Sequence, residues 1–196
     1  IGKRNYWTII THTKSSCPFI SVPLIVAQTE YPECQRWNDA VIEDILDRQP
    51  DLVVTSMVTN HFAVGARNQE DNQERLASGL LRSWSHLTDQ GIRIAAIRGT
   101  PRMGQLVPNC IAENSQAPDK CAVDRAIALN HGGAITMAVN RSDKLVKLID
   151  MSDAFCDDST CRPIVGNILV YRDQHHITKT YMKTVAPVLE NRLSQF

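Results

Sequence analysis

Apolar runs alternate with amphipathic segments along the chain, and this order constrains the fold more than any other feature. The run DLVVTS (51–56) has almost no polar alternation, as is typical of a strand covered on both faces. IRIAAI (92–97) and LVKLID (145–150) also predict strands. Between the first two strands, apolar residues recur at helical spacing: Leu76, Leu80, Trp84 and Leu87. Strands that alternate with helices predict an α/β fold with a mainly parallel sheet.

The remaining segments extend this pattern toward both ends. Residues 36–49 predict a helix that ends before Pro50, and 178–193 predict a terminal helix. YWTIIT (6–11) predicts a further strand, and NILVYR (167–172) extends the short apolar run toward the site. The stretch 122–142 suits a helix in composition but contains two adjacent glycines. At 196 residues, this pattern predicts one domain: a three-layer α/β/α sandwich.

Six cysteines form three near pairs: Cys17 and Cys34, Cys110 and Cys121, Cys156 and Cys161. Local spacing favours these three among the possible pairings, so we expect three disulfides rather than free thiols. The chain has no CxxC spacing, and too few histidines lie near the cysteines for a zinc finger. Each closed loop would add about 2–4 kcal/mol of stability. Disulfides persist in oxidising compartments, so we expect the domain to lie outside the cytoplasm.

Charge and hydropathy exclude several classes of function. Formal net charge is +0, and no basic stripe runs along the chain, so we expect no nucleic-acid partner. No window reaches the roughly 20 apolar residues that a membrane helix needs. The sequence also contains no motif for a cofactor, and we expect none.

One short stretch, YRDQHHIT (171–178), carries the residues best suited to catalysis. His176 lies three residues after Asp173, so the carboxylate could orient the imidazole as a general base. Two other interpretations are open at this point. Asp173 could cap the terminal helix while the histidines are solvated, or the neighbouring His175 and His176 could bind a metal. Adjacent histidines rarely reach one ion, and we expect no metal site.

The wider context resembles a known family. LVYRDQHHIT, preceded by DAFCDDSTCRPIVGN, is similar to the C-terminal block of SGNH-type hydrolases. It resembles most the extracytoplasmic SGNH domains fused to bacterial membrane acyltransferases of the acyltransferase-three family. THTKSSCP (11–18), residues 33–54, TPRMGQLVPNC (100–110) and VKLIDMSDAFC (146–156) follow in the family's order. The similarity covers essentially the whole chain, and all six cysteines fit it.

The resemblance implies roles for individual residues. His176 would be the general base and Asp173 its orienting acid. Ser16 stands where the family has the glycine of the oxyanion hole, a role that a backbone N–H can fill. Asn60 is the candidate for the asparagine of that hole, although the family's Gly-x-Asn-Asp pattern is absent.

The nucleophile departs from the family. Its Gly-Asp-Ser motif occurs nowhere in these 196 residues. We therefore expect residues 1–196 to form a single SGNH-like domain whose first strand, with the serine, lies upstream of residue 1. Ser16 and Ser56 are weak substitutes, because neither lies on a strand-to-helix elbow.

The resemblance implies serine-dependent transfer of an acyl group, commonly acetyl, to an envelope carbohydrate or glycolipid, or hydrolysis of such an ester. The partners of the domain would be the acyl donor and this carbohydrate or glycolipid acceptor. It also implies fusion to a membrane acyltransferase domain at the extracytoplasmic face of a bacterial membrane. The alternative is a non-catalytic module that binds a glycan or docks a partner.

Overall fold

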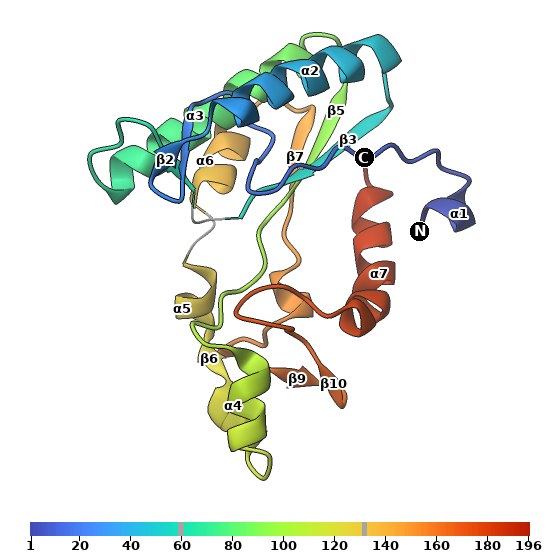
Figure 1. Ribbon diagram of the computed structural model, residues 1–196. Coiled ribbons are helices and arrows are strands. Elements are labelled where there is room, and N and C mark those ends of the chain that lie inside the picture. Colours follow the sequence, from blue (N-terminus) through green and yellow to red (C-terminus); the bar gives the residue numbers. More distant parts are fainter. Residues whose placement is uncertain (59–60, 131–132) are drawn as a thin grey trace.

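Three parallel strands form the central sheet of the computed structural model, which describes residues 1–58, 61–130 and 133–196. These strands are β3 (Leu52–Ser56), β5 (Arg93–Ile97) and β7 (Val146–Ile149), in the order β3-β5-β7. The register pairs Val53 with Ile94 and Ile94 with Val146. The three apolar runs of the sequence thus form one parallel sheet, which confirms the predicted fold class (Figure 1).

Helices α2 (Pro32–Arg48), α3 (Gln69–Thr88) and α6 (Gly133–Arg141) belong to one hydrophobic core together with one face of the sheet. That face presents Ile94 and Ala96, both 0% exposed. The apolar stripe predicted for α3 is buried at all four positions: Leu76, Leu80, Trp84 and Leu87. Helical periodicity therefore identified the main contact surface of this layer.

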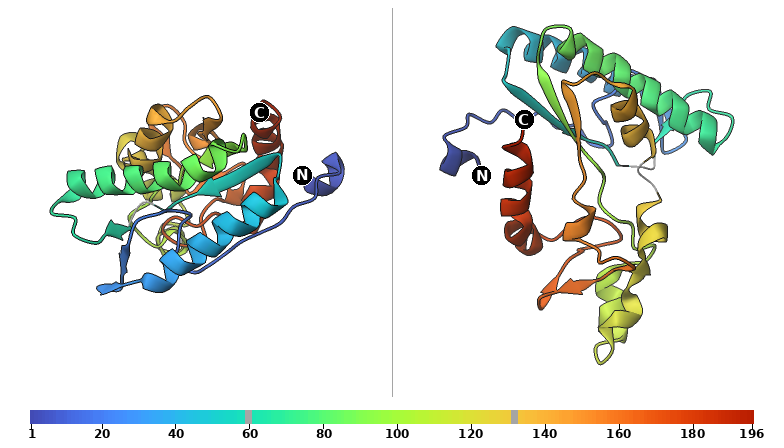
Figure 2. Two further views of the ribbon diagram at one scale, coloured as in Figure 1. Left: turned by 90° about the horizontal axis from the view of Figure 1, so that it is seen from above. Right: turned by 180° about the vertical axis from the view of Figure 1, so that it is seen from behind.

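Helix α7 (Lys179–Leu193) lies on the opposite face of the sheet (Figure 2). Tyr181 and Val185 of α7 join Ala95 in a second hydrophobic core. The chain thus has the three layers that the sequence predicted. On this face Val54, in β3, is 49% exposed, so the described residues leave β3 partly open to solvent.

Short elements complete the fold. A small antiparallel sheet has the order β2-β1-β4, and two further two-stranded sheets pair β6 with β8 and β9 with β10. The bounds of the short strands are β1 Leu24–Val26, β2 Thr29–Glu30, β4 Phe62–Ala63, β6 Val123–Asp124, β8 Thr160–Cys161, β9 Ile164–Val165 and β10 Ile168–Leu169. The short helices are α1 Gly2–Asn5, α4 Val107–Glu113 and α5 Arg125–Leu129, with 3-10 turns at Pro118–Cys121 and Ser152–Ala154.

The strand predicted at residues 6–11 was wrong. Residues 6–11 form no strand, and Ile9 and Ile10 are 62% and 51% exposed. A β-branched run becomes a strand only when another strand pairs with its backbone, and the described chain supplies none here. In the stretch 167–172 only β10 forms, and it pairs antiparallel with β9, outside the central sheet.

The cysteines form the three near pairs favoured by their spacing: Cys17–Cys34, Cys110–Cys121 and Cys156–Cys161. The first joins the loop before β1 to α2, and the other two lie among the short elements beyond the carboxyl ends of the central strands. Within the described residues, no helix has both the length and the apolar content to cross a membrane.

Candidate active site

A tight loop, residues 170–178, joins β10 to α7 and carries the acid and the two histidines; we call it the histidine loop. Its two sides are hydrogen-bonded to each other: Arg172 N donates to His176 O at 2.9 Å, and Thr178 N donates to Val170 O at 2.8 Å. The Thr178 hydroxyl also accepts a bond from Tyr181 N and so caps α7. Asp173 is therefore not the cap of α7.

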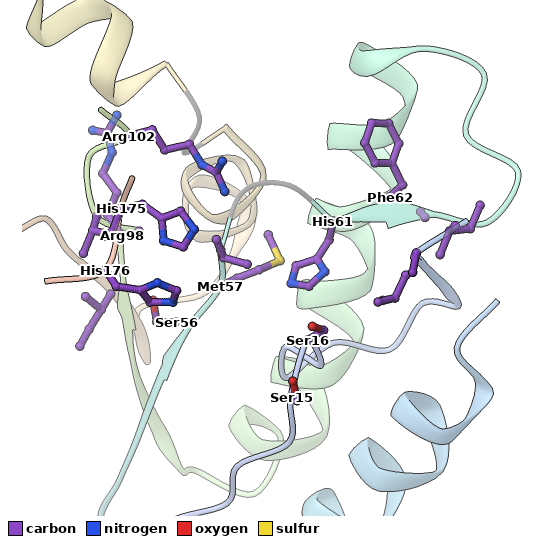
Figure 3. Close-up of a pocket in the computed structure, with 18 of the residues that line it drawn as sticks. Ser15, Ser16, Ser56, Met57, His61, Phe62, Arg98, Arg102, His175 and His176 are labelled. Carbon is purple, nitrogen blue, oxygen red and sulfur yellow. The ribbon is translucent and has the colours of Figure 1, made fainter. Parts of the chain in front are cut away.

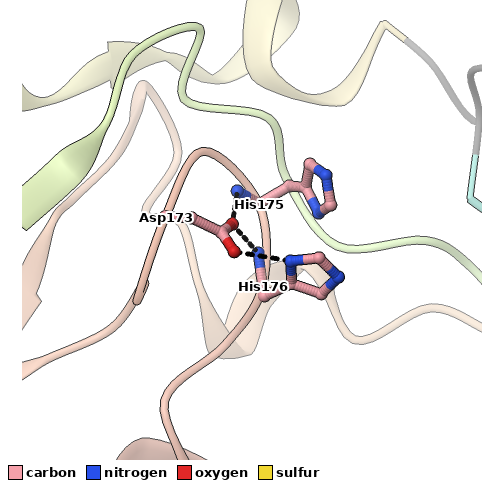
Figure 4. A group of neighbouring side chains, drawn as sticks. All are labelled: Asp173, His175 and His176. Carbon is pink, nitrogen blue, oxygen red and sulfur yellow. Dashed lines mark hydrogen bonds and ion pairs between the residues drawn. The ribbon is translucent and has the colours of Figure 1, made fainter.

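Asp173 instead organises the loop around itself (Figure 4). Its Oδ1 accepts the backbone N–H groups of His175 and His176 at 2.9 and 2.8 Å. Its Oδ2 lies 2.6 Å from His176 Nδ1. Partial burial acts to raise the pKa of Asp173, but these hydrogen bonds hold the pKa well below its ordinary value. Asp173 thus stays ionised and fixes the tautomer that leaves His176 Nε2 as an acceptor.

The segment after β5, residues 98–107, lies beside the histidine loop and is hydrogen-bonded to its backbone. Thr100 Oγ1 donates to His175 O at 2.7 Å, and Met103 N donates to Gln174 O at 2.8 Å. Val107 N adds a longer bond to Asp173 O at 3.4 Å. Two carbonyls of the loop thus have hydrogen-bond partners on a neighbouring segment, which hold the backbone that carries His176. The His176 side chain itself is 55% exposed.

A cavity of about 870 Å³ opens in front of the two histidines (Figure 3). It lies at the carboxyl ends of β3 and β5, where parallel sheets place their functional groups. His175 and His176 line one side of it, and His61 and Ser16 line another. Ser56, the last residue of β3, also lines the cavity.

His61 is held in the cavity wall by a buried asparagine. Asn72, on α3, is 0% exposed and donates from Nδ2 to His61 O at 2.9 Å. Its Oδ1 accepts Ala63 N at 2.8 Å, so one amide fixes the chain on both sides of Phe62. His61 itself is only 6% exposed, and burial lowers its pKa. It therefore presents a neutral imidazole to the cavity.

Ser16 is positioned by a second buried asparagine and by a disulfide. Asn38, on α2, is 0% exposed; it accepts Ile20 N at 3.0 Å and donates to Pro18 O at 3.0 Å. The Cys17–Cys34 bond joins the same loop to α2. Ser16 has a positive φ of 53°, which turns the chain at the cavity edge.

Two arginines lie beside the histidines. Arg98, directly after β5, donates to Asp150 Oδ2 at 2.8 Å and to Leu129 O at 3.0 Å. Arg102 lies next to His175 in Figure 3. Burial is the first cause that lowers the pKa of His175, and the positive charge of the nearby Arg102 lowers it further. His175 is therefore neutral near pH 7.

The structure brings together some of the residues singled out from the sequence. Asp173 and His176 are in direct contact, and Ser16 lines the same cavity as His176. Asn60 lies outside the described residues. His61, Arg98 and Arg102 were missed, although Arg98 follows a predicted strand, a position where functional side chains gather. No spacing in the sequence could have indicated His61.

A metal ion could use one ligand atom from each of three residues: Asp173, His175 and His176. These atoms lie within 4.8 Å of one another. Both oxygens of Asp173 already accept hydrogen bonds within the loop. An ion would have to break the bond between Asp173 and His176 to use that carboxylate. In this geometry the Asp173 carboxylate is therefore bonded to the loop backbone and to the His176 ring.

Comparison with known proteins gives two matches. The model of the family "SGNH domain (fused to AT3 domains)" matches residues 1–191. Among solved structures, the chain is similar to the periplasmic domain of the lipopolysaccharide acetyltransferase of Salmonella ser. Paratyphi A, with a TM-score of 0.66. The two are 17% identical over 96% of this chain and 75% of that one, a likeness of fold. No curated protein matches the chain.

Proposed function

This chain belongs to the family of SGNH domains that are fused to AT3 domains, and from that premise we propose that it acts in serine-dependent acyl chemistry. The observation that carries the proposal is the contact of 2.6 Å between Asp173 Oδ2 and His176 Nδ1 at the mouth of a cavity. An ionised carboxylate on Nδ1 leaves Nε2 to accept a proton, as a general base requires.

The reaction would proceed in two steps. His176 Nε2 takes the proton of a serine hydroxyl while the serine oxygen attacks an acyl carbonyl; the donor's C–O bond then breaks, and its oxygen leaves with that proton. In the second step a sugar hydroxyl gives its proton to His176 and attacks the acyl-serine. The serine oxygen leaves and recovers the proton. Water in place of the sugar gives hydrolysis.

The serine is proposed to come from a segment outside these 196 residues, which contain no Gly-Asp-Ser. Two features support this part of the proposal. Val54, on the α7 side of β3, is 49% exposed although it lies in the central sheet. In addition, the cavity beside His176 has room for another side chain. A neighbouring strand that carries the serine would cover β3 and bring its hydroxyl to this cavity.

The negative charge that develops on the acyl oxygen needs hydrogen-bond donors. We propose the backbone at Ser16 for this role, because Ser16 lines the cavity on a chain held by the Cys17–Cys34 bond. Asn60 is proposed as a second donor from its place in the sequence, one residue before His61.

The natural substrate is proposed to be a glycan or glycolipid of the cell envelope, either as the acceptor of an acetyl group or as an acetyl ester that is hydrolysed. The fold relative is named as a lipopolysaccharide acetyltransferase periplasmic domain. Three disulfides support a position outside the cytoplasm, and the family's AT3 partner supports tethering to a membrane. The absence of Gly-Asp-Ser also suits an alternative, a non-catalytic module that binds a glycan.

A single assay separates the enzyme from the non-catalytic binding module. The full-length protein is tested for hydrolysis of 4-nitrophenyl acetate, with His176→Ala as the variant and His86→Ala, exposed on α3, as the matched control. The enzyme proposal expects a loss of about 10³-fold for His176→Ala and none for the control. Equal activity in wild type and His176→Ala would remove His176 from the mechanism, and no activity in either would favour the binding module.

A further inference from the structure

The cavity in front of His176 is lined by positive and neutral groups. Arg98 and Arg102 line it together with His61, His175 and His176. No Asp or Glu is among its lining residues in the described chain, and none of the residues outside that description is acidic. A concave surface with charge of one sign attracts ligands of the opposite sign.

The two acids that bond to side chains lining the cavity, Asp150 and Asp173, have several hydrogen-bond partners each. Asp150 accepts Arg98 Nη1 at 2.8 Å and also a bond from Ser152 N at 2.9 Å. Asp173 accepts two backbone N–H groups and the His176 ring. Both oxygens of each carboxylate therefore accept a hydrogen bond within the protein, and neither faces an anion bound beside Arg102 without a partner.

Arg102 is also fixed relative to the candidate base. Thr100, two residues before it, and Met103, directly after it, both bond to the histidine loop, at 2.7 and 2.8 Å. Its own N–H donates to Ala128 O at 2.9 Å. These bonds hold the backbone that carries the guanidinium against the loop that carries His176. A ligand bound by Arg102 would therefore keep a constant position relative to the His176 ring.

We propose that the sugar on which this site acts carries an anionic group, a carboxylate or a phosphate, and that Arg102 binds it so that the neighbouring ester or hydroxyl oxygen lies at His176. This inference rests on the proposed function and adds the chemical class of its substrate. A guanidinium group binds either anion through two parallel N–H···O hydrogen bonds, which orient the anion as well as attract it. Arg98, which is bonded to Asp150, adds a second positive charge to the same cavity.

The test uses the full-length protein and two matched pairs of acetylated sugars. One pair is an O-acetyl hexuronate and its uncharged methyl ester; the other is an O-acetyl hexose with and without a 6-phosphate. We expect kcat/KM to favour the anionic member of at least one pair by about 10- to 100-fold, mainly through KM. The pair that shows the preference identifies the carboxylate or the phosphate.

Three variants test the assignment to Arg102. Arg102→Gln should bring the preference down to about one, and Arg102→Lys should retain part of it, because lysine keeps the charge but lacks the fork. Arg36→Gln, an exposed arginine on α2, is the control and should keep the wild-type preference. A wild-type preference in Arg102→Gln would overturn the assignment. If that variant fails to fold, the wild-type preference and Arg102→Lys decide the question.

The outcomes separate this inference from the proposal on which it rests. Hydrolysis of 4-nitrophenyl acetate with kcat/KM ratios near one in both sugar pairs would overturn the anionic substrate alone. No hydrolysis of any ester, the aryl acetate included, would overturn the proposed function and this inference with it.

Discussion

The two sides of the cavity are built in different ways. The histidine loop, residues 170–178, is stabilised by a partly buried carboxylate, that of Asp173, which bonds to its own neighbours in the sequence. The opposite wall, which we define as residues 15–20 and 61–63, is held by two completely buried asparagines, Asn38 and Asn72, on different helices. The histidine loop thus carries the reactive groups on local hydrogen bonds, and the stability of the whole domain depends little on it. The opposite wall is tied into the core and gives the cavity its shape.

This difference predicts two kinds of variant. Changes in the histidine loop should lower activity and leave the free energy of unfolding nearly unchanged. Changes in the opposite wall should lower the free energy of unfolding and affect activity less. Variants that behave the other way would break the distinction.

The largest effect is expected for Asp173→Asn in the full-length protein. The asparagine oxygen can still accept the backbone N–H groups, but its NH₂ group would face His176 Nδ1 and favour the wrong tautomer. We expect kcat for an aryl acetate to fall by about 10²- to 10⁴-fold while the melting temperature changes by only about 2 °C. A kcat within about threefold of wild type would show that Asp173 does not orient the base.

The double variant Cys17→Ser/Cys34→Ser should give the largest loss of stability in the opposite wall. The bond joins residues 17 positions apart, and its removal frees that loop in the unfolded chain. We expect the free energy of unfolding to fall by about 3 kcal/mol in denaturant titration. A loss near zero would mean that Asn38 alone holds the loop.

Asn72→Ala should come next. It leaves His61 O and Ala63 N without the partner that now satisfies both. The expected cost is about 2 kcal/mol of unfolding free energy, measured by denaturant titration. Asn140→Ala, at an exposed position on α6, is the control and should change stability by no more than about 0.5 kcal/mol.

The smallest expected effect is the contribution of His61 to the pH dependence of stability. Its pKa in the folded state is lowered by burial, so below about pH 6.5 the unfolded chain binds more protons at this residue. Stability should therefore fall as pH drops from 7.5 to 5.5, with His175 acting in the same direction. In His61→Gln this fall should be smaller by up to about 1 kcal/mol, measured by thermal unfolding at both pH values. An identical fall in the variant would show that His61 titrates normally.

Much of the fold follows from local pattern. The buried stripe of α3, the three parallel strands and the pairing of the cysteines all depend on spacing within short stretches, and the structure has them as predicted. The strand expected at 6–11 failed because a strand needs a neighbour, and propensity cannot supply one. The contact between Asp173 and His176 was predictable for the same reason, since three residues separate them.

The sequence alone determined which residues could act as acid and base, and the order of the strands and helices that carry them. Tertiary structure decided what surrounds that pair. His61, Arg98 and Arg102 reach the cavity because parallel strands align their carboxyl ends and because buried asparagines turn distant loops toward one point. Such contacts join segments far apart in the chain, so no local spacing can specify them.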